Sequence, residues 1–385
     1  MFDSKKSKKI LIIAGSRGEY GYIRPIIREI KKTKDFDYEM VVCNMHVLDT
    51  FGSSIEEIKK DDVKIGAVVH NTLDGYNRLT MTKSLGIFMM ELPAIIERIK
   101  PDFILIAGDR GEQFMAAIVG AHMYIPVVHI QAGELSGNID GAVRHAITKL
   151  AHIHLCSNED AAQRVGKMGE ETFRIFNVGA PQLDELVAGE MLSEKEVREK
   201  YGIKKNKPSI LLVQHSVTEE FDQAEKQMAE TMKAVAETGY QTIIVLNNSD
   251  AGSKIMRKAV FKYRTPKMKI FENMPRADYA GLMKAAFVLV GNSSSGIIEA
   301  PLFKLPVVNI GNRQMGRMRG VNVINVSHNS AKIRLAIQKA ISPKFKKQAA
   351  KAVSLYGDGK SAKRILDILA KLKIDNKLLV KQLTY

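Results

Sequence analysis

The stretch Gly291-Asn292-Ser293-Ser294-Ser295-Gly296-Ile297-Ile298-Glu299 follows an apolar run at 285–290 and precedes Ala300-Pro301-Leu302-Phe303. This order predicts a strand, a turn of small hydroxyl residues and the start of a helix. Such a junction directs backbone N–H groups and the positive end of a helix dipole at a ligand, which suits the phosphates of a nucleotide. Glu299, about one turn along the helix, would then reach ribose hydroxyls. Serine also caps helices that bind nothing, so this stretch alone favours a phosphate site and a plain cap about equally.

Short apolar runs alternate with longer amphipathic stretches along the whole chain. The runs lie at 10–14, 38–43, 103–107, 127–130, 210–214, 242–246, 269–271, 288–290 and 307–310. Helical candidates lie between them at 78–99, 111–123, 142–150, 219–238 and 276–284. This alternation predicts an α/β fold with parallel sheets that helices cover on both faces.

A chain of 385 residues exceeds what one hydrophobic core usually supports, so we expect two domains. The stretch 179–208 is polar and contains no convincing strand, which predicts a helical connection. We therefore expect one Rossmann-like domain at 1–180 and a second at 181–360. The lysine-rich tail, 361–385, is predicted to add a helix to the first domain and to end in a loose C-terminus.

The formal net charge of +16 raises the question of nucleic-acid binding. The basic residues are scattered, however, and form no stripe interleaved with aromatic residues. A basic surface around a site for an anionic small molecule fits better. No nucleic-acid partner is predicted.

The apolar run after Lys5-Lys6-Ser7-Lys8-Lys9 is too short for a signal peptide, and no apolar stretch approaches membrane-spanning length. The only cysteines, Cys43 and Cys156, lie far apart and lack metal-ligand spacing. We expect a cytoplasmic protein with two structural thiols, no membrane partner, no metal and no cofactor.

Polar residues follow the predicted strands, at the edge where open α/β sheets bind ligands. They are Gly15-Ser16-Arg17, Gly108-Asp109-Arg110, Gln131-Ala132-Gly133-Glu134 with Asp140, Arg144 and His145, Gln214-His215-Ser216, and Asn247-Asn248-Ser249-Asp250. Each has a plainer interpretation, because aspartates cap helices, a histidine can simply be packed and an arginine can pair structurally. Their coincidence at one edge favours a site. The glycine turn before Arg17 suits a phosphate but lacks the G-x-G-x-x-G spacing of a nicotinamide site.

The run His129-Ile130-Gln131-Ala132-Gly133-Glu134-Leu135-Ser136-Gly137-Asn138-Ile139-Asp140, continued by Arg144-His145-Ala146-Ile147-Thr148-Lys149-Leu150-Ala151-His152, closely resembles the hydrolysing UDP-N-acetylglucosamine 2-epimerases. That family includes the epimerase half of the bifunctional animal enzyme of sialic acid synthesis. Further matches follow in order over nearly the whole chain: Gly108-Asp109-Arg110, Gln214-His215, Asp250-Ala251-Gly252-Ser253, Gly291-Asn292-Ser293-Ser294, Arg313-Gln314-Met315-Gly316-Arg317 and Tyr356-Gly357-Asp358-Gly359.

The resemblance implies a GT-B fold, in which a catalytic N-terminal domain faces a nucleotide-binding C-terminal domain across a cleft. It implies conversion of UDP-N-acetylglucosamine to N-acetylmannosamine and UDP, by elimination to 2-acetamidoglucal and then hydration. It also implies that no metal is required, and that the chain pairs through its N-terminal domain as a homodimer, with a tetramer as the alternative.

The same resemblance implies a catalytic group made of Asp109, Arg110, Gln131, Glu134, Asp140, Arg144, His145 and His215. Asp109 is the first candidate for the essential carboxylate and Asp140 the second. No carbonyl acidifies the proton on carbon 2, so departure of UDP must drive the reaction. Carboxylates crowded into one site should raise at least one pKa and so supply an acid and a base.

Two positions depart from the pattern of some relatives, which carry Glu at the position of Gln131 and a second acid at that of Gly141. We expect Glu134 to substitute for the missing carboxylate.

Nucleotide contacts are implied as well. Arg17, His215, Ser293 and Ser294 would hold the diphosphate, Glu299 the ribose, and the backbone around Asn273 and Met274 the base. Asn248 and Arg313 would be neighbours.

Four alternatives stay open at this stage. One is a hydrolysing 2-epimerase of a UDP- or GDP-linked 2,4-diacetamido-trideoxy sugar for legionaminic-type acids, and another is a non-hydrolysing epimerase. A GT-B glycosyltransferase and a non-catalytic nucleotide-sugar sensor are the others.

Overall fold

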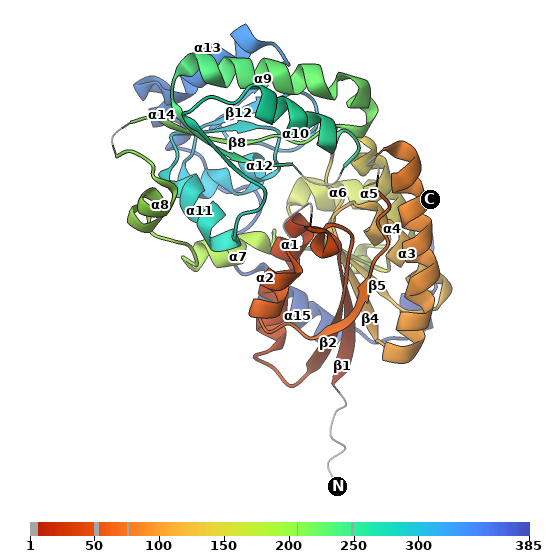
Figure 1. Cartoon of the computed structure of the whole chain (residues 1–385). Coiled ribbons are helices and arrows are strands. Elements are labelled where there is room, and N and C mark those ends of the chain that lie inside the picture. Colours follow the sequence, from red (N-terminus) through yellow and green to blue (C-terminus); the bar gives the residue numbers. More distant parts are fainter. Residues whose placement is uncertain (1–6, 50–53, 75–76, 206, 248–249) are drawn as a thin grey trace.

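The protein is described here from a computed structural model that covers residues 7–49, 54–74, 77–205, 207–247 and 250–385. The chain forms two parallel sheets, each with helices on both faces, that lie in separate halves of the molecule (Figure 1). The first sheet has the strand order β3-β2-β1-β4-β5-β6-β7 and the second β10-β9-β8-β11-β12-β13. The connection between the sheets carries two helices, as predicted, and its described residues contain no strand.

The first sheet and its helices come from the N-terminal half of the chain. The strands are β1 (Lys8–Ala14), β2 (Phe36–Cys43), β3 (Ile65–Val69), β4 (Phe103–Ala107), β5 (Val127–Ala132), β6 (Ile153–Cys156) and β7 (Ile175–Asn177). The helices are α1 (Arg17–Ile30), α2 (Ile55–Lys60), α3 (Arg78–Ile99), α4 (Gly111–His122), α5 (Ile139–Leu150), α6 (Glu159–Lys167) and α7 (Gln182–Val187).

The second sheet follows from residue 209. Its strands are β8 (Ser209–Val213), β9 (Gln241–Val245), β10 (Met268–Phe271), β11 (Val288–Gly291), β12 (Val307–Ile310) and β13 (Val323–Val326). The later helices are α8 (Glu194–Tyr201), α9 (Ala224–Thr238), α10 (Ser253–Lys262), α11 (Arg276–Ala285), α12 (Ser295–Ile298), α13 (Ser330–Ile341), α14 (Pro343–Ala349), α15 (Ser361–Lys371) and α16 (Asn376–Leu379).

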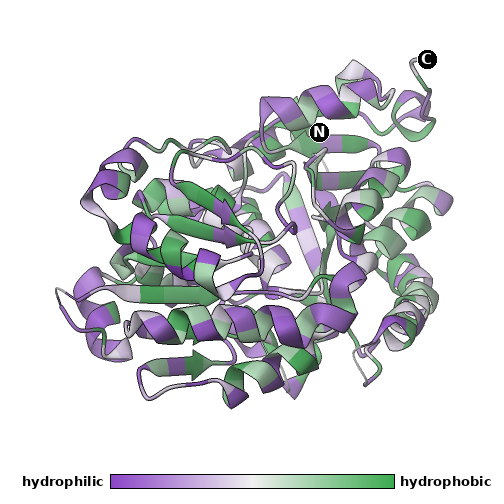
Figure 2. Cartoon of the chain, turned by 90° about the horizontal axis from the view of Figure 1, so that it is seen from above, coloured by the Kyte–Doolittle hydropathy of each residue, from purple (hydrophilic) through white to green (hydrophobic). Residues whose placement is uncertain are grey.

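The strand β1 shows why these runs are apolar without alternation. Ile10 and Ile12 face a core shared with α1 and α15, whereas Leu11 and Ile13 face a second core with α3 and α4. Because helices cover both faces of a parallel sheet, every position of a central strand is buried. In Figure 2 the strands are mostly green and the helices carry a green and a purple face.

All nine predicted strands are present, and each predicted helix overlaps a helical segment of the structure. The strands β3, β6, β7 and β13 are not predicted from the sequence, because they are short and each contains a polar or exposed residue. The candidate at 219–238 is divided, since Thr218–Gln223 forms a 3-10 helix before α9 begins.

The long helix α3 corrects the expectation that no apolar stretch approaches membrane-spanning length. By length and composition it could cross a membrane, with a mean hydropathy of 1.3. Its Phe88, Leu92 and Ile96 are nevertheless buried in the core beside α4. Core helices of globular proteins commonly meet the same criterion, so α3 alone does not indicate a membrane span.

The C-terminal tail returns to the first domain, where α15 packs on α1 (Figure 1). Ile365 and Leu369 share a core cluster with Ile23 and Ile27. The sequence predicted a loose C-terminus, but the end of the chain is anchored. The buried Arg174 donates hydrogen bonds to the backbone carbonyls of residues 377, 378 and 380. Both cysteines are free and buried.

Candidate active site

A cavity of about 250 Å³ lies between the two sheets, at the carboxyl ends of their strands. Loops after β1, β4, β8, β10 and β11 form its walls. This is the place where open α/β sheets bind ligands. The predicted residues that line it are Arg17, Asp109, Arg110, Asp140, His215, Asn273, Met274, Ser293, Ser294, Glu299 and Arg313.

The serine loop enters this cavity as the sequence predicts, but the helix after it is short. β11 ends at Gly291, α12 spans only Ser295–Ile298, and a 3-10 helix, Ala300–Phe303, follows. One helical turn supplies a smaller dipole than the expected longer helix. Among the described residues, no acceptor pairs with the N–H groups of Ser293 and Ser294. The anion-binding capacity of the loop therefore comes mainly from these amides.

Gly291 cannot be replaced without moving the loop. Its φ is +130°, and a Cβ there would lie 2.0 Å from the backbone oxygen of Val213. This close approach brings the serine loop against the end of β8, next to His215. Glycine is needed because only it tolerates both the angle and the contact.

Arg17 bridges the two domains as the first residue of α1. Its guanidinium donates to the backbone oxygen of Glu272 at 2.9 Å and to Oδ1 of Asn273 at 2.7 Å. Burial, together with the positive charge of Arg257, lowers the pKa of Arg17 to about 10. The group stays charged at neutral pH and can contact phosphate.

Glu299 lies on the cavity wall in an ion pair with Arg276, at 2.7 Å. Nearby, the Tyr279 hydroxyl lies 2.6 Å from the hydroxyl of Ser295, which in turn lies 2.9 Å from that of Ser293. The carboxylate of Glu299 is thus oriented before any ligand arrives, as a ribose acceptor would need to be.

Asp109 forms the opposite wall. Gly108, with a φ of +84°, turns the chain after β4. The Asp109 carboxylate then pairs with Arg144, whose guanidinium also donates to the backbone oxygen of Gln131 at 2.8 Å. Arg144 is 1 % exposed, so it holds Asp109 from inside the protein.

Gln131 lines a small polar side pocket of about 60 Å³ together with Asp109, Asp140 and Arg144. Its φ of +62° is unusual for a residue with a side chain, and the β5–β6 register shifts beside it. Strain of this kind often marks functional loops.

Asp140, the second candidate for the essential carboxylate, has a raised pKa. Burial raises its pKa to about 6, with Asp109 and Asp250 adding like-charge repulsion. The Asn138 amide donates to it at 2.8 Å. The expected raised pKa is present, but burial contributes more to it than crowding does.

Arg110 and His215 complete the polar wall of the cavity. Arg110 pairs with Asp250 at 2.9 Å. Burial, with Arg313 adding to it, lowers the pKa of His215 to about 3. His215 is therefore neutral near pH 7 and suited to hydrogen bonding rather than to carrying positive charge.

Two predicted residues lie outside both cavities. Glu134 is buried and accepts a hydrogen bond from Asn158 at 2.8 Å, and burial raises its pKa. His145 is half-buried on α5, one residue beyond Arg144. Catalytic roles for both stay predictions. Asn248 lies outside the described residues.

The sequence analysis missed Glu19 and His46, which also line the cavity. Glu19 accepts from the backbone N–H groups of Gly15 and Ser16, and burial raises its pKa to about 8. Ser16 and Glu19 form a capping box, a spacing visible in the sequence. His46 lies in a 3-10 helix after β2, where no sequence signal marked it.

Within the described residues, no group of three or more His, Cys, Asp or Glu side chains is arranged to hold a metal ion.

Comparison with known proteins gives a consistent picture. The sequence model of the family described as UDP-N-acetylglucosamine 2-epimerase matches residues 28–370. A hydrolysing UDP-N,N'-diacetylbacillosamine 2-epimerase of Legionella pneumophila is 35 % identical over 97 % of this chain and 98 % of its own. A UDP-N-acetylglucosamine 2-epimerase of Neisseria meningitidis is 34 % identical over 87 % of this chain and 88 % of its own.

Solved structures support the fold. A Neisseria meningitidis UDP-GlcNAc 2-epimerase bound to UDP-GlcNAc superposes with a TM-score of 0.81 at 19 % identity, covering 94 % of this chain and 100 % of that one. The Methanocaldococcus jannaschii enzyme in complex with UDP-GlcNAc and UDP gives 0.77 at 20 % identity, covering 94 % and 99 %. The predicted GT-B architecture is thereby confirmed.

Proposed function

The chain belongs to the UDP-N-acetylglucosamine 2-epimerase family, and on that premise we propose that it is a hydrolysing 2-epimerase of a UDP-linked 2-acetamido sugar. One observation carries the proposal. Asp109 and Asp140 line one wall of a single cavity, and the serine loop with Glu299 lines another. In this proposal Asp109 and Asp140 would face the sugar, while N–H groups and arginines would face its leaving phosphate.

The proposed reaction has two steps. A base removes the proton on carbon 2, the C–H electron pair forms the C1–C2 double bond, and the C1–O bond breaks with its electrons leaving on UDP. Water then adds hydroxide to carbon 1 and a proton to carbon 2 on the face opposite to the one that lost its proton. The products are UDP and the free 2-epimeric sugar.

The two carboxylates, Asp109 and Asp140, suit these two reaction steps. Asp140, with a pKa of about 6, can hold or release a proton near neutral pH. Asp109 is kept in place by Arg144 and lies where it can stabilise positive charge developing on the sugar.

On the nucleotide side, Arg17, Arg313, Ser293 and Ser294 line the cavity. The two guanidinium groups and the two serine amides would stabilise the negative charge of departing pyrophosphate. Glu299 would accept from ribose hydroxyls, and the Asn273–Met274 backbone would meet the base. Catalysis needs interactions that are stronger in the transition state than in the ground state. These contacts would therefore lower the barrier as the C1–O bond breaks and negative charge develops on the pyrophosphate.

UDP-N-acetylglucosamine, which would yield N-acetylmannosamine for a sialic-type acid, is the first substrate we propose. UDP-N,N'-diacetylbacillosamine is the second, since the Legionella relative named for it matches almost end to end.

The test is to incubate the protein in heavy water with each nucleotide sugar, including the GDP-linked diacetamido sugar, and to follow the products by proton NMR. Free nucleotide and a 2-epimer deuterated at carbon 2 would support the proposal, and the ratio of kcat/KM values would identify the substrate. Intact nucleotide sugars without deuterium exchange would overturn it.

The same spectra separate the rival activities. A non-hydrolysing epimerase would return a UDP-linked 2-epimer, a glycosyltransferase would release UDP without deuterium at carbon 2, and a sensor would bind without turnover.

We also propose a homodimer through the outer face of α3. Leu79 is 64 % and Met90 75 % exposed there, on the side away from the core. Light scattering should give twice the chain mass for the wild type and a smaller mass for Met90→Asp. An unchanged dimer in the variant would exclude this face.

A further inference from the structure

Helix α5 joins the candidate active site to the opposite side of the first domain. Asp140 lies in its first turn and Arg144 one turn later. At the other end, about 17 Å away at 1.5 Å per residue, the last carbonyl groups have no partners within the helix. These carbonyls need donors from elsewhere in the chain.

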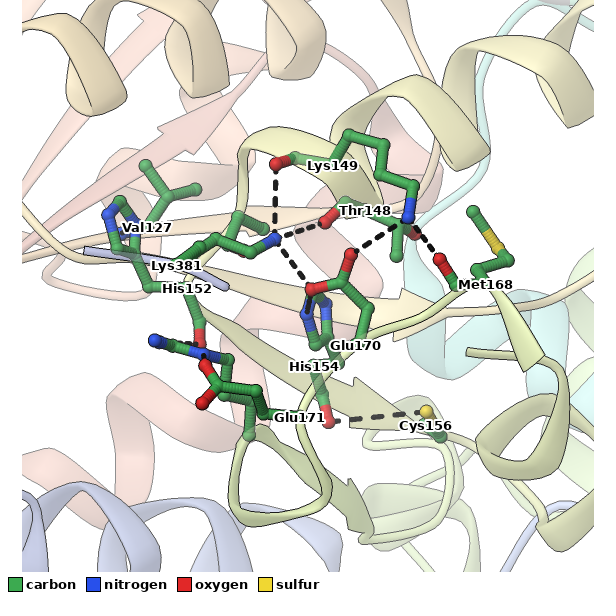
Figure 3. A network of polar contacts seen from close by, with 12 residues as sticks. Val127, Thr148, Lys149, His152, His154, Cys156, Met168, Glu170, Glu171 and Lys381 are labelled. Carbon is green, nitrogen blue, oxygen red and sulfur yellow. Dashed lines mark hydrogen bonds and ion pairs between the residues drawn. The ribbon is translucent and has the colours of Figure 1, made fainter. Parts of the chain in front are cut away.

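Lys381, in the C-terminal tail, supplies them. Its Nζ donates to the backbone oxygens of Thr148 at 2.8 Å, Lys149 at 3.1 Å and Ala151 at 2.6 Å (Figure 3). A cation at this end also complements the negative end of the helix dipole. One ammonium group therefore caps the helix that carries Asp140.

Glu170 holds the ammonium group from the other side, at 2.6 Å. Figure 3 shows it between Lys381, Lys149 and His154. Burial alone would raise the pKa of Glu170, but the hydrogen bonds from His154 and Lys381 outweigh it and bring the value to about 2. Glu170 is thus the counter-ion of Lys381: burial lowers the pKa of Lys381, and the hydrogen bond and charge of Glu170 oppose that shift.

The tail itself is anchored, so the cap has a defined position. Arg174, 0 % exposed, donates to the carbonyls of Leu378 at 2.7 Å and Lys377 at 2.8 Å, and to that of His152 at 3.2 Å. Earlier in the tail, α15 packs on α1, whose first residue is Arg17. The tail therefore contacts α1 and α5, two of the helices whose N-termini reach the cavity.

We propose that Lys381 is a positioning residue, which fixes α5 from its C-terminal end and thereby places Asp140 and Arg144 for the reaction. The positioning role rests on the proposed function. The capping of α5 does not.

Two variants and a control test the inference. Lys381→Met removes the charge and donors, Lys381→Arg keeps a cation, and Lys373→Met removes an exposed lysine from the same tail. Hydrogen exchange of the amides near the end of α5 should accelerate about tenfold in Lys381→Met. Lys381→Arg should restore most of the protection, and the control should match the wild type.

Catalysis gives the second measurement. In Lys381→Met we expect kcat to fall about tenfold, because small displacements of catalytic groups are costly. The Kd for UDP from calorimetry should stay within about twofold, since most of the proposed UDP contacts come from the second domain. Unchanged exchange would overturn the capping, and faster exchange with unchanged kcat would overturn the positioning role. The exchange measurement needs no substrate, so it decides the capping even if no nucleotide sugar is turned over, an outcome that would overturn the proposed function instead.

Discussion

The backbone N–H of Gly137 donates to the backbone oxygen of Arg313 at 3.1 Å, joining the loop before α5 to the loop after β12. A Cβ on Gly137 would lie 1.9 Å from the backbone oxygen of Asn312. Close by, Nε of Arg317 donates to the carbonyl of Leu135 at 2.8 Å. The two domains thus meet through backbone contacts directly beside Asp140.

Gly137→Ala should therefore keep the domains from closing fully. We expect kcat to fall about tenfold, because Asp140 and Arg313 would be displaced from each other, with little change in UDP affinity. Steady-state kinetics and calorimetry measure the two effects. Gly86→Ala is the matched control, since a Cβ there meets nothing within 4 Å. Equal rates for both variants would contradict the role of the contact.

Asp109→Asn keeps the shape of the side chain and removes its charge. We expect turnover to fall by about 10³-fold, within the range for loss of an acid–base or electrostatic group, while UDP still binds. Because Arg144 loses its ionic partner, the melting temperature should be measured alongside kcat. Asp160→Asn on the surface of α6 should leave both unchanged. A near-normal rate would remove Asp109 from the mechanism.

Glu134→Gln tests whether Glu134 replaces the carboxylate missing at Gln131. The amide can keep the hydrogen-bonded contact with Asn158 after a flip, so folding should be preserved. Since the side chain lies outside the cavity, we expect a smaller loss of kcat than in Asp109→Asn. A loss as large as that of Asp109→Asn would show that Glu134 takes part in proton transfer, and unchanged turnover would exclude it.

Asp140 should make stability depend on pH. Its pKa is raised from 3.8 to about 6 on folding, so the folded state binds the proton more tightly. Its stabilising contribution is present below pH 3.8 and is lost as the pH rises through about 6. Asp140→Asn lacks this titration and should gain stability relative to the wild type between about pH 4 and about pH 7. Urea unfolding at both ends of this pH range measures the difference in unfolding free energy between the variant and the wild type. A difference that does not change with pH would contradict the prediction.

Arg17→Met should weaken UDP binding. Loss of one charge-assisted contact costs about 2 kcal/mol, or roughly 30-fold in Kd. Calorimetry with UDP measures this change. Arg28→Met, on the same helix but paired with Glu185 and Glu190 away from the cavity, is the control. If both variants bind UDP as the wild type does, Arg17 does not contact the diphosphate.

Much of the fold was predictable because its signals are local. Apolar runs such as Ile10 to Ala14 are continuous only in strands buried on both faces, and Gly291 and the serines after it mark a turn with small residues. Strands such as β7, with the sequence Ile-Phe-Asn, are too short to leave a pattern. They exist because a neighbouring strand is already in place to pair with them.

The sequence alone determined the alternation of strands and helices, the loops at the strand ends and eleven of the residues that line the cavity, because these depend on residue type and spacing within short windows. Tertiary structure decided which of these residues meet. It brought Asp140 to Asp109 and raised its pKa, turned Glu134 toward Asn158, and placed Lys381 against the end of α5. Burial and contacts between residues hundreds of positions apart set these properties, and no local window of the sequence contains them.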